Sequence, residues 1–333
     1  MKKQILAASL LAASSTAFAG SHGACGDVVI GEMNWASGEF LARVDGLIMG
    51  EGYKCNVEYL TAGTVPQITS MTEKGTPDIA SELWANAAAV AIDAAVAEKR
   101  LVKLNPAPIT GAGEGWMVSA AAAKAHPELK TIDDIIARPD LFPHPEDPSK
   151  GGLHNCPSGW GCQLATANLF RAFDMEAKGW KLIDTGSGAG LDGSIAKASE
   201  RDQNWLGYYW APTTLAGKYN LKLVDFNSGF DQDHWDTCIV KPVEECDSPK
   251  RSTWTVSEVV SLAQVDFTER APAVAEYVKA RTFDADLLNK YLTFMSDNQA
   301  SGEEAAEEFI LNEEATWSKW VSEEAAANIR KAL

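Results

Sequence analysis

Tryptophan is the residue type through which this sequence is best equipped for chemistry. Eleven tryptophans occur among 333 residues, against seven tyrosines. An indole face carries a negative quadrupole, and it attracts a cationic head by about 0.5–2 kcal/mol per contact. A quaternary ammonium has no N–H to donate, so several such faces are the natural way to capture it. The candidates stand at predicted strand ends, in a loop, or where the chain returns to its first half: Trp35, Trp84, Trp160, Trp210 and Trp254. For each ring taken singly, the alternative is an ordinary place in a hydrophobic core.

One of these rings lies in a short loop bracketed by cysteines, HNCPSGWGCQ (His154 to Gln163). A Cys156–Cys162 bridge would hold Trp160 in place before a ligand arrives, which reduces the entropy lost on binding. The stretch that follows, GCQLATANLFRAF, predicts a helix beginning near Gly161. Helix N-termini attract carboxylates. The backbone amides of Gly161 and Cys162 are therefore candidates for holding an anionic ligand tail, and an ordinary helix start is the alternative.

The N-terminus and the cysteines together indicate an exported protein. The first twenty residues, MKKQILAASLLAASSTAFAG, combine a basic start, an apolar run and an A-x-A site, so we predict a signal peptide cleaved after about Ala19 and a soluble periplasmic product. Six cysteines remain. An even number in an exported chain favours disulfides over a metal site, and we expect no metal. Six cysteines allow fifteen pairings, and proximity in the sequence favours Cys25–Cys55, Cys156–Cys162 and Cys238–Cys246.

The charge balance narrows the choice of partners. The formal net charge is −17. Such acidity argues against nucleic acid and anionic membranes, which bind basic patches. It weakly favours cationic ligands, although adaptation to a saline habitat would produce the same balance. Three carboxylates near predicted strand ends, Glu32, Glu82 and Glu114, could offset a cationic head, and a solvated carboxylate is the alternative for each.

Several motifs suggest other functions but lack residues that those functions need. Gly188 to Gly193 matches G-x-G-x-x-G, yet Asp192 adds a negative charge at that turn, so we expect a flexible loop and no nucleotide or other cofactor. The acidic stretch Asp231 to Asp236 lacks the glycine and final glutamate of a calcium loop, so we expect a solvated turn. Neither G-x-S-x-G nor H-E-x-x-H occurs. An exported hydrolase using His154 or His234 as proton carrier stays a minor alternative.

These candidate residues must be positioned by an α/β fold. Strand patterns at 27–34, 54–63 and 77–84 alternate with helix patterns at 37–52 and 64–75, which predicts mostly parallel sheets flanked by helices. A second unit follows, with strands at 180–185 and 204–210 and a helix from Ser194. From about Val256 the pattern is mostly helical, including the stretch from Ser257 to Phe267.

We therefore expect two lobes with a ligand cleft between them. The first lobe is built from both ends of the chain. The expected boundaries are a signal peptide at 1–19, the first part of lobe 1 at 20–117, lobe 2 at 118–235, and a return to lobe 1 with C-terminal helices at 236–333.

At these residues the chain resembles the glycine betaine/proline betaine-type substrate-binding proteins of ABC importers, over nearly its whole mature length. NCPSGWGCQ is the most specific element, and DIASELWANA and GYYWAPTTLAGKYNLKLVDF resemble the family's two cage-bearing strands. The resemblance implies a two-lobed periplasmic binding protein fold (type II-like). It implies that Trp84 is a first-lobe wall, that Trp160 and Trp210 are second-lobe walls, and that the Gly161 and Cys162 amides form the carboxylate site.

The sequence also departs from the family pattern. Some members clamp the ligand carboxylate with an arginine soon after the Trp84-like position, but here no basic residue occurs before Lys99 and Arg100. Trp35 and Trp254 look like additional walls.

The functional hypothesis is a non-enzymatic receptor, expected to be monomeric, that delivers a methylated onium compatible solute to a membrane permease and its ATPase. The candidate solutes are glycine betaine, dimethylsulfoniopropionate, choline, carnitine and trimethylamine N-oxide. A receptor for another small polar solute, such as an amino acid, is the alternative.

Overall fold

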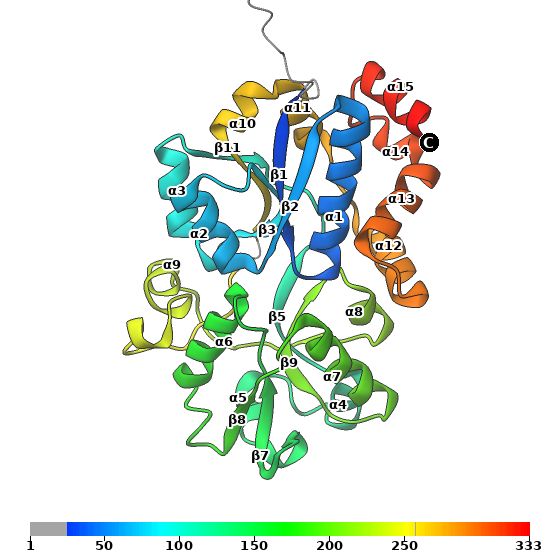
Figure 1. Cartoon of the computed structure of the whole chain (residues 1–333). Helices are drawn as coiled ribbons and strands as arrows, with labels where there is room; N and C mark the ends of the chain where they lie inside the picture. Colours follow the sequence, from blue (N-terminus) through cyan, green and yellow to red (C-terminus); the bar gives the residue numbers. More distant parts are fainter. Residues whose placement is uncertain (1–24, 257) are drawn as a thin grey trace, which may run out of the picture.

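The chain forms two α/β lobes, stacked one above the other in Figure 1. The computed structural model describes residues 25–256 and 258–333, so the predicted signal peptide lies outside the described residues. The chain passes from the first sheet to the second after β4 and returns before β11. Among the described residues, no helix has both the length and the apolar character needed to cross a membrane.

The first lobe is built on a five-stranded sheet of order β2-β1-β3-β11-β4. Its strands are β1 (Asp27–Met33), β2 (Asn56–Ala62), β3 (Ile79–Trp84), β4 (Leu101–Asn105) and β11 (Val259–Gln264). Its helices are α1 (Ala36–Leu47), α2 (Thr64–Lys74), α3 (Ala89–Ala97), α10 (Val265–Arg270), α11 (Pro272–Ala280), α12 (Ala285–Asn298), α13 (Gly302–Asn312), α14 (Glu314–Trp317) and α15 (Glu323–Ala332). The last four helices run along one side of this lobe, beside α1 (Figure 1).

The second lobe is built on a six-stranded sheet of order β10-β5-β9-β7-β6, with β8 paired to β7. Its strands are β5 (Gly113–Val118), β6 (Pro143–His144), β7 (Asp147–His154), β8 (Trp180–Ile183), β9 (Leu206–Ala211) and β10 (Lys222–Leu223). Its helices are α4 (Ala120–Ala125), α5 (Ile132–Ile136), α6 (Gly161–Ala172), α7 (Gly188–Glu200), α8 (Thr214–Lys218) and α9 (Gln232–His234). Short π-helical turns follow α1 at Ile48–Gly52 and α9 at Trp235–Ile239 (η4).

Burial explains why these segments are strands. Every residue of β3 and of β11 is buried, because helices pack against these central strands, so neither strand alternates between a buried and an exposed face. The edge strand β2 is only half-buried and alternates instead.

The sheets agree with the expected fold class, and two expectations about local structure were wrong. Most strands of each sheet run in the same direction, as expected, but β11 enters from the other lobe and lies antiparallel between β3 and β4, and β5 lies antiparallel to β9. The segment that contains β11, expected to be helical, is a buried strand, since a short apolar run fits either structure. The expected flexible loop at Gly188 to Gly193 is instead the start of α7, where the Ser187 side chain caps the amide of Gly190.

The structure also bears on the cysteines and the chain crossings. The three disulfides are Cys25–Cys55, Cys156–Cys162 and Cys238–Cys246, the pairing expected from proximity.

Strand β5 belongs to the second sheet, although the boundary expected at 117 leaves most of it in the first lobe. The boundaries at 117 and 235 stay predictions.

A cavity between the lobes lined by tryptophan

A cavity lies between the lobes, where the ends of β1 and β3 approach the N-terminus of α6 and the end of β9. Its volume is about 30 Å³, so the lining side chains lie close together around it. All five tryptophans singled out in the sequence line it, together with two further aromatic residues: Trp35, Trp84, Trp160, Trp210, Trp254, Tyr208 and Trp235.

The indole rings of the two lobes meet at this cavity. Trp35, which precedes α1 in the first lobe, lies with its ring centroid 5.1 Å from that of Trp160 in the second lobe, edge to face. Trp160 in turn lies 5.3 Å from Trp210, also edge to face. Edge-to-face contacts at this range are favourable aromatic geometry. The rings therefore form a continuous wall that crosses the gap between the lobes.

The polar edges of three rings are held by hydrogen bonds. The Nε1–H groups of Trp35 and Trp84 each donate to Oε1 of Glu82 at 2.9 Å. Glu82 and Trp84 lie two positions apart on β3, so their side chains share one face of the strand. Trp160 Nε1–H donates at 2.8 Å to Oδ1 of Asn34, which belongs to the other lobe. With their N–H groups bonded, the rings are fixed in orientation.

Burial shapes the electrostatics of Glu82. Burial raises the pKa of its carboxyl group, and the hydrogen bonds from Trp84, Trp35 and Ser37 act in the opposite direction. Of the other two acidic candidates, Glu114 lies on the cavity wall, but Glu32 does not. Glu32 instead accepts a hydrogen bond from Arg43 at 2.5 Å and another from Thr61 at 2.8 Å.

Strand β9 supplies a second part of the wall. Tyr208 and Trp210 lie two positions apart on it and both line the cavity. The Tyr208 hydroxyl donates to Oε2 of Glu114 at 2.7 Å. Burial and the neighbouring Glu114 raise the pKa of Tyr208 well above its usual range, so the hydroxyl keeps its proton. Trp254 lies in the segment that returns to the first lobe, and its ring centroid is 5.4 Å from that of Tyr208.

Trp235 is the wall residue that the sequence interpretation missed. It lies within the acidic stretch Asp231 to Asp236 that was expected to be a solvated turn, yet it is only 2 % exposed and lines the cavity beside Val240. The signal in the sequence was its type and its position, a tryptophan three residues before Cys238. Acidic neighbours on one side of a helical turn do not prevent burial of the other side.

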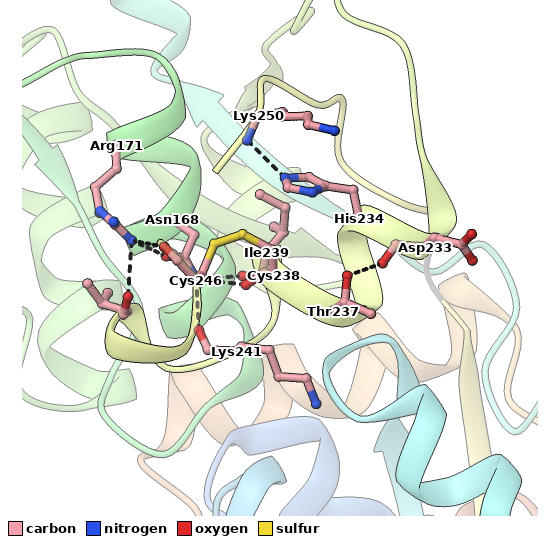
Figure 2. Close-up of a disulfide and its surroundings, with 11 residues drawn as sticks. Asn168, Arg171, Asp233, His234, Thr237, Cys238, Ile239, Lys241, Cys246 and Lys250 are labelled. Atoms are coloured by element: carbon pink, nitrogen blue, oxygen red, sulfur yellow. Dashed lines mark hydrogen bonds between the residues drawn. A yellow bond between two sulfur atoms is a disulfide. The ribbon is translucent and has the colours of Figure 1, made fainter. Parts of the chain in front are cut away.

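A disulfide and an amide clamp hold this part of the wall. Figure 2 shows the Cys238–Cys246 bridge against α6, where one side chain, Asn168, reaches the backbone of the bridged loop. Its Nδ2 donates to the carbonyls of Cys238 and Ile239 at 3.1 Å each and to that of Lys241 at 2.8 Å. The turn that carries Trp235 is thereby fixed to the helix whose N-terminus opens on the cavity.

The loop closed by Cys156–Cys162 forms part of the wall and also touches the first lobe. Trp160 is the residue before the first turn of α6, which has no side-chain cap, and the next two residues, Gly161 and Cys162, line the cavity. Across the gap, the amide of Val65 donates to the carbonyl of Gly159 at 3.1 Å. The structure therefore has the lobes in contact around the cavity.

Basic residues and the two candidate histidines lie elsewhere. Among the described residues that line the cavity, none is lysine or arginine. His154 Nδ1 lies 3.0 Å from the carbonyl of Leu206, with its ring stacked on Trp205, and Nε2 of His234 accepts from the amide of Lys250. Neither histidine lines the cavity, which removes the geometric basis for a proton carrier there.

Comparison with known proteins places the chain among binding proteins. The sequence profile of the family described as the substrate binding domain of ABC-type glycine betaine transport system matches residues 26–312. No curated protein matches the chain in sequence.

Solved structures share the fold at low identity. A glycine/betaine/L-proline-binding protein from Borrelia burgdorferi is 16 % identical with a TM-score of 0.70, covering 91 % of this chain and 99 % of its own. A choline-binding ABC-transporter protein in complex with choline is 15 % identical with a TM-score of 0.72, covering 92 % and 98 %. Lactococcal OpuAC in its closed-liganded conformation with glycine betaine is 17 % identical with a TM-score of 0.64, covering 89 % and 99 %.

Proposed function

The chain belongs to the family of substrate-binding domains of ABC-type glycine betaine transport systems, and from this premise we propose that it captures a methylated onium solute in the tryptophan-lined cavity. The proposed walls are Trp35 and Trp84 from the first lobe, Trp160 and Trp210 from the second, and Trp254 from the returning segment. The family is one of transport proteins, and the proposed role involves no chemical conversion of the ligand.

The observation that carries this proposal is the convergence of indoles from both lobes on one cavity, with Trp35 and Trp160 in ring contact across the gap. A ring buried in the core of its own lobe would have no such partner. Three or four desolvated contacts of about 0.5–2 kcal/mol each contribute about 1.5–8 kcal/mol in total. A dissociation constant of about 1 μM corresponds to about −8 kcal/mol, so burial of the ligand's methyl groups, at about 0.8 kcal/mol per CH₂-sized group, must add to the indole contacts to offset the ordering costs of association.

The tail of the ligand is proposed to lie at the N-terminus of α6, where the amides of Gly161 and Cys162 face a carboxylate or an N-oxide oxygen. The lining carries Glu114 and no basic side chain among its described residues. A cavity of this charge suits a cationic or zwitterionic solute better than an anionic one. Glycine betaine, dimethylsulfoniopropionate, choline, carnitine and trimethylamine N-oxide all satisfy that condition.

In the cell, the protein is proposed to act as a monomeric periplasmic receptor that delivers its solute to a permease with its ATPase. Closing of the lobes around the ligand would present one surface from each lobe to the permease. Family membership supports this proposal.

Titration of the mature protein with these five solutes, followed by intrinsic tryptophan emission, tests the proposal. We expect saturable binding of at least one, because a ligand in this cavity contacts several indoles. Binding of an amino acid alone would favour the alternative receptor, and no response to any onium solute would contradict the proposal.

The role of Trp160 is tested by Trp160→Ala, which we expect to abolish binding at micromolar ligand while the fold is retained. Trp180→Phe is the matched control, since Trp180 is buried in the core of the same lobe away from the cavity. An unchanged affinity for Trp160→Ala in calorimetry would refute the assigned role.

A further inference from the structure

A single buried carboxylate, Glu82, lies behind two of the proposed cage walls. Its Oε1 accepts three hydrogen bonds, from Trp35 and Trp84 at 2.9 Å and from the Ser37 hydroxyl at 3.0 Å. The side chain is 1 % exposed, and its Oε2 has no hydrogen-bond partner among the described residues. Glu82 does not itself line the cavity, whereas the two indoles that donate to it do.

A buried cation acts on the Glu82 carboxyl group and lowers its pKa, in the same direction as the hydrogen bonds to Oε1. The nearby buried cation is Arg281, whose Nε lies 2.8 Å from Oδ1 of Asp45 in a fully buried ion pair. Arg281 also donates to the carbonyl of Ser81 and the hydroxyl of Ser261. Because Arg281 pairs directly with Asp45, it offsets the charge of Glu82 only in part, and the three donors on Oε1 favour the ionised form of this carboxyl group beside the cavity. An unpaired buried charge is costly, and a cation brought close to it relieves that cost.

We propose that Glu82 is a specificity-determining residue, which makes the tryptophan cage prefer a ligand head with a full positive charge over a neutral head of the same shape. This inference rests on the proposed function, and it adds a reason for selectivity that the indoles alone do not supply. Indole faces also bind neutral methyl groups by dispersion and burial, whereas a buried carboxylate acts only on charge. Its interaction with the ligand is strong because the intervening medium is protein rather than water.

The hydrogen bonds from the indoles give Glu82 a second effect in the same direction. A carboxylate that accepts an indole N–H draws positive charge to that edge of the ring and increases the electron density of the remaining ring. Two walls of the cage, Trp35 and Trp84, share one oxygen atom in this way. The same contacts fix both rings before the ligand binds, which lowers the ordering cost.

The substitution Glu82→Gln separates charge from shape. Glutamine keeps an Oε1 acceptor for the two indoles and nearly the same volume, but it carries no charge. The probes are choline and 3,3-dimethylbutan-1-ol, its neutral analogue with carbon in place of nitrogen, each titrated by tryptophan emission with wild type and variant. We expect choline to bind about tenfold or more weakly to Glu82→Gln, and the neutral analogue to change less than about threefold.

The near-UV circular dichroism of the unliganded proteins serves as the structural control, and we expect it to be unchanged, which shows that the rings keep their arrangement. An equal loss for both probes, or a loss for neither, would overturn the proposal, because charge would then not be the source of selectivity. A tenfold loss for choline with an unchanged spectrum supports it even where the neutral analogue does not saturate. Failure of wild type to bind any onium solute would instead refute the proposed function.

Discussion

Gly161 lies where the second lobe meets the first, and one added methyl group tests whether the lobes close as the structure shows. A Cβ atom on Gly161 would lie 1.9 Å from Cβ of Ala87 and 3.3 Å from its Cα, whereas carbon atoms pack at about 3.5–4.0 Å. Both atoms of Ala87 are fixed to the backbone, so no side-chain rotation relieves the overlap. The lobes must therefore separate at this point in Gly161→Ala.

The expected cost can be worked from that overlap. Overpacking by one methylene-sized group costs about 1–3 kcal/mol, which corresponds to about a fivefold to 150-fold weaker affinity for the solute. The stability of the unliganded protein should change by less than about 1 kcal/mol, because the open lobes avoid the contact and alanine favours the helix. The amide of residue 161 remains in the variant, so the loss reports on closure rather than on a missing donor.

Calorimetric titration and thermal unfolding of the unliganded protein measure the two quantities. The matched control is Gly193→Ala in α7 of the same lobe, where an added Cβ meets no atom within 4 Å; its affinity should stay within about twofold of wild type. If Gly161→Ala bound the solute as tightly as wild type, Gly161 and Ala87 would not be in contact in the liganded state, and the closed geometry described above would be wrong.

Three further predictions follow from contacts in the two lobes. Asn34→Ala removes the acceptor for Trp160 across the gap (2.8 Å), and we expect about 1 kcal/mol weaker binding, or roughly fivefold, by calorimetry. The double variant Cys156→Ser/Cys162→Ser opens a bridge of sequence separation 6, so we expect about 2 kcal/mol lower stability in denaturant titration and weaker ligand binding, because Trp160 is no longer held. Burial lowers the pKa of His154 to about 4, below its unfolded value near 6.5. Its contribution to stability is therefore complete above about pH 6.5 and is lost as the pH falls toward 4, by up to about 3 kcal/mol in unfolding experiments.

Each of these has a control. An Asn34→Ala protein with wild-type affinity would show that the interlobe bond is absent when ligand is bound. Cys25→Ser/Cys55→Ser removes a bridge of the first lobe that does not line the cavity, so it should lower stability without changing affinity. Glutamine does not titrate, so replacing His154 with glutamine should reduce the decrease in the free energy of unfolding between pH 6.5 and 4. An equally large decrease in this variant would show that other groups cause it.

The sequence predicted the parts of the site that depend on local pattern. Trp35, Trp84 and Trp210 stand at or just beyond the ends of strands. The alternation of strand and helix is a local property, so the sequence alone was enough to predict that these residues lie at strand ends. The paired cysteines followed from export and proximity. Fold class and family were confirmed on this basis. The roles of the five tryptophans and of the Gly161 and Cys162 amides stay predictions.

Other predictions were wrong or missed because the local sequence pattern does not determine the features concerned. The run that became β11 is equally compatible with a helix, and only its place between β3 and β4 makes it a strand. The antiparallel direction of β11 depends on where the chain re-enters the first lobe. Trp235 was missed because its neighbours in the sequence are acidic, whereas its neighbours in space are Trp254 and Phe230.

By itself, the sequence determined which side chains this protein brings to a ligand. These are indoles at strand ends and in a loop closed by two cysteines, in a chain of negative net charge with no arginine soon after Trp84. The tertiary structure alone decided how those side chains are held. Glu82 reaches Trp35 across 47 positions of the chain, and Asn34 reaches Trp160 across 126. The physical reason is that periodicity reflects only the backbone within a few residues, whereas hydrogen bonds between distant segments form only when the packed lobes bring them together.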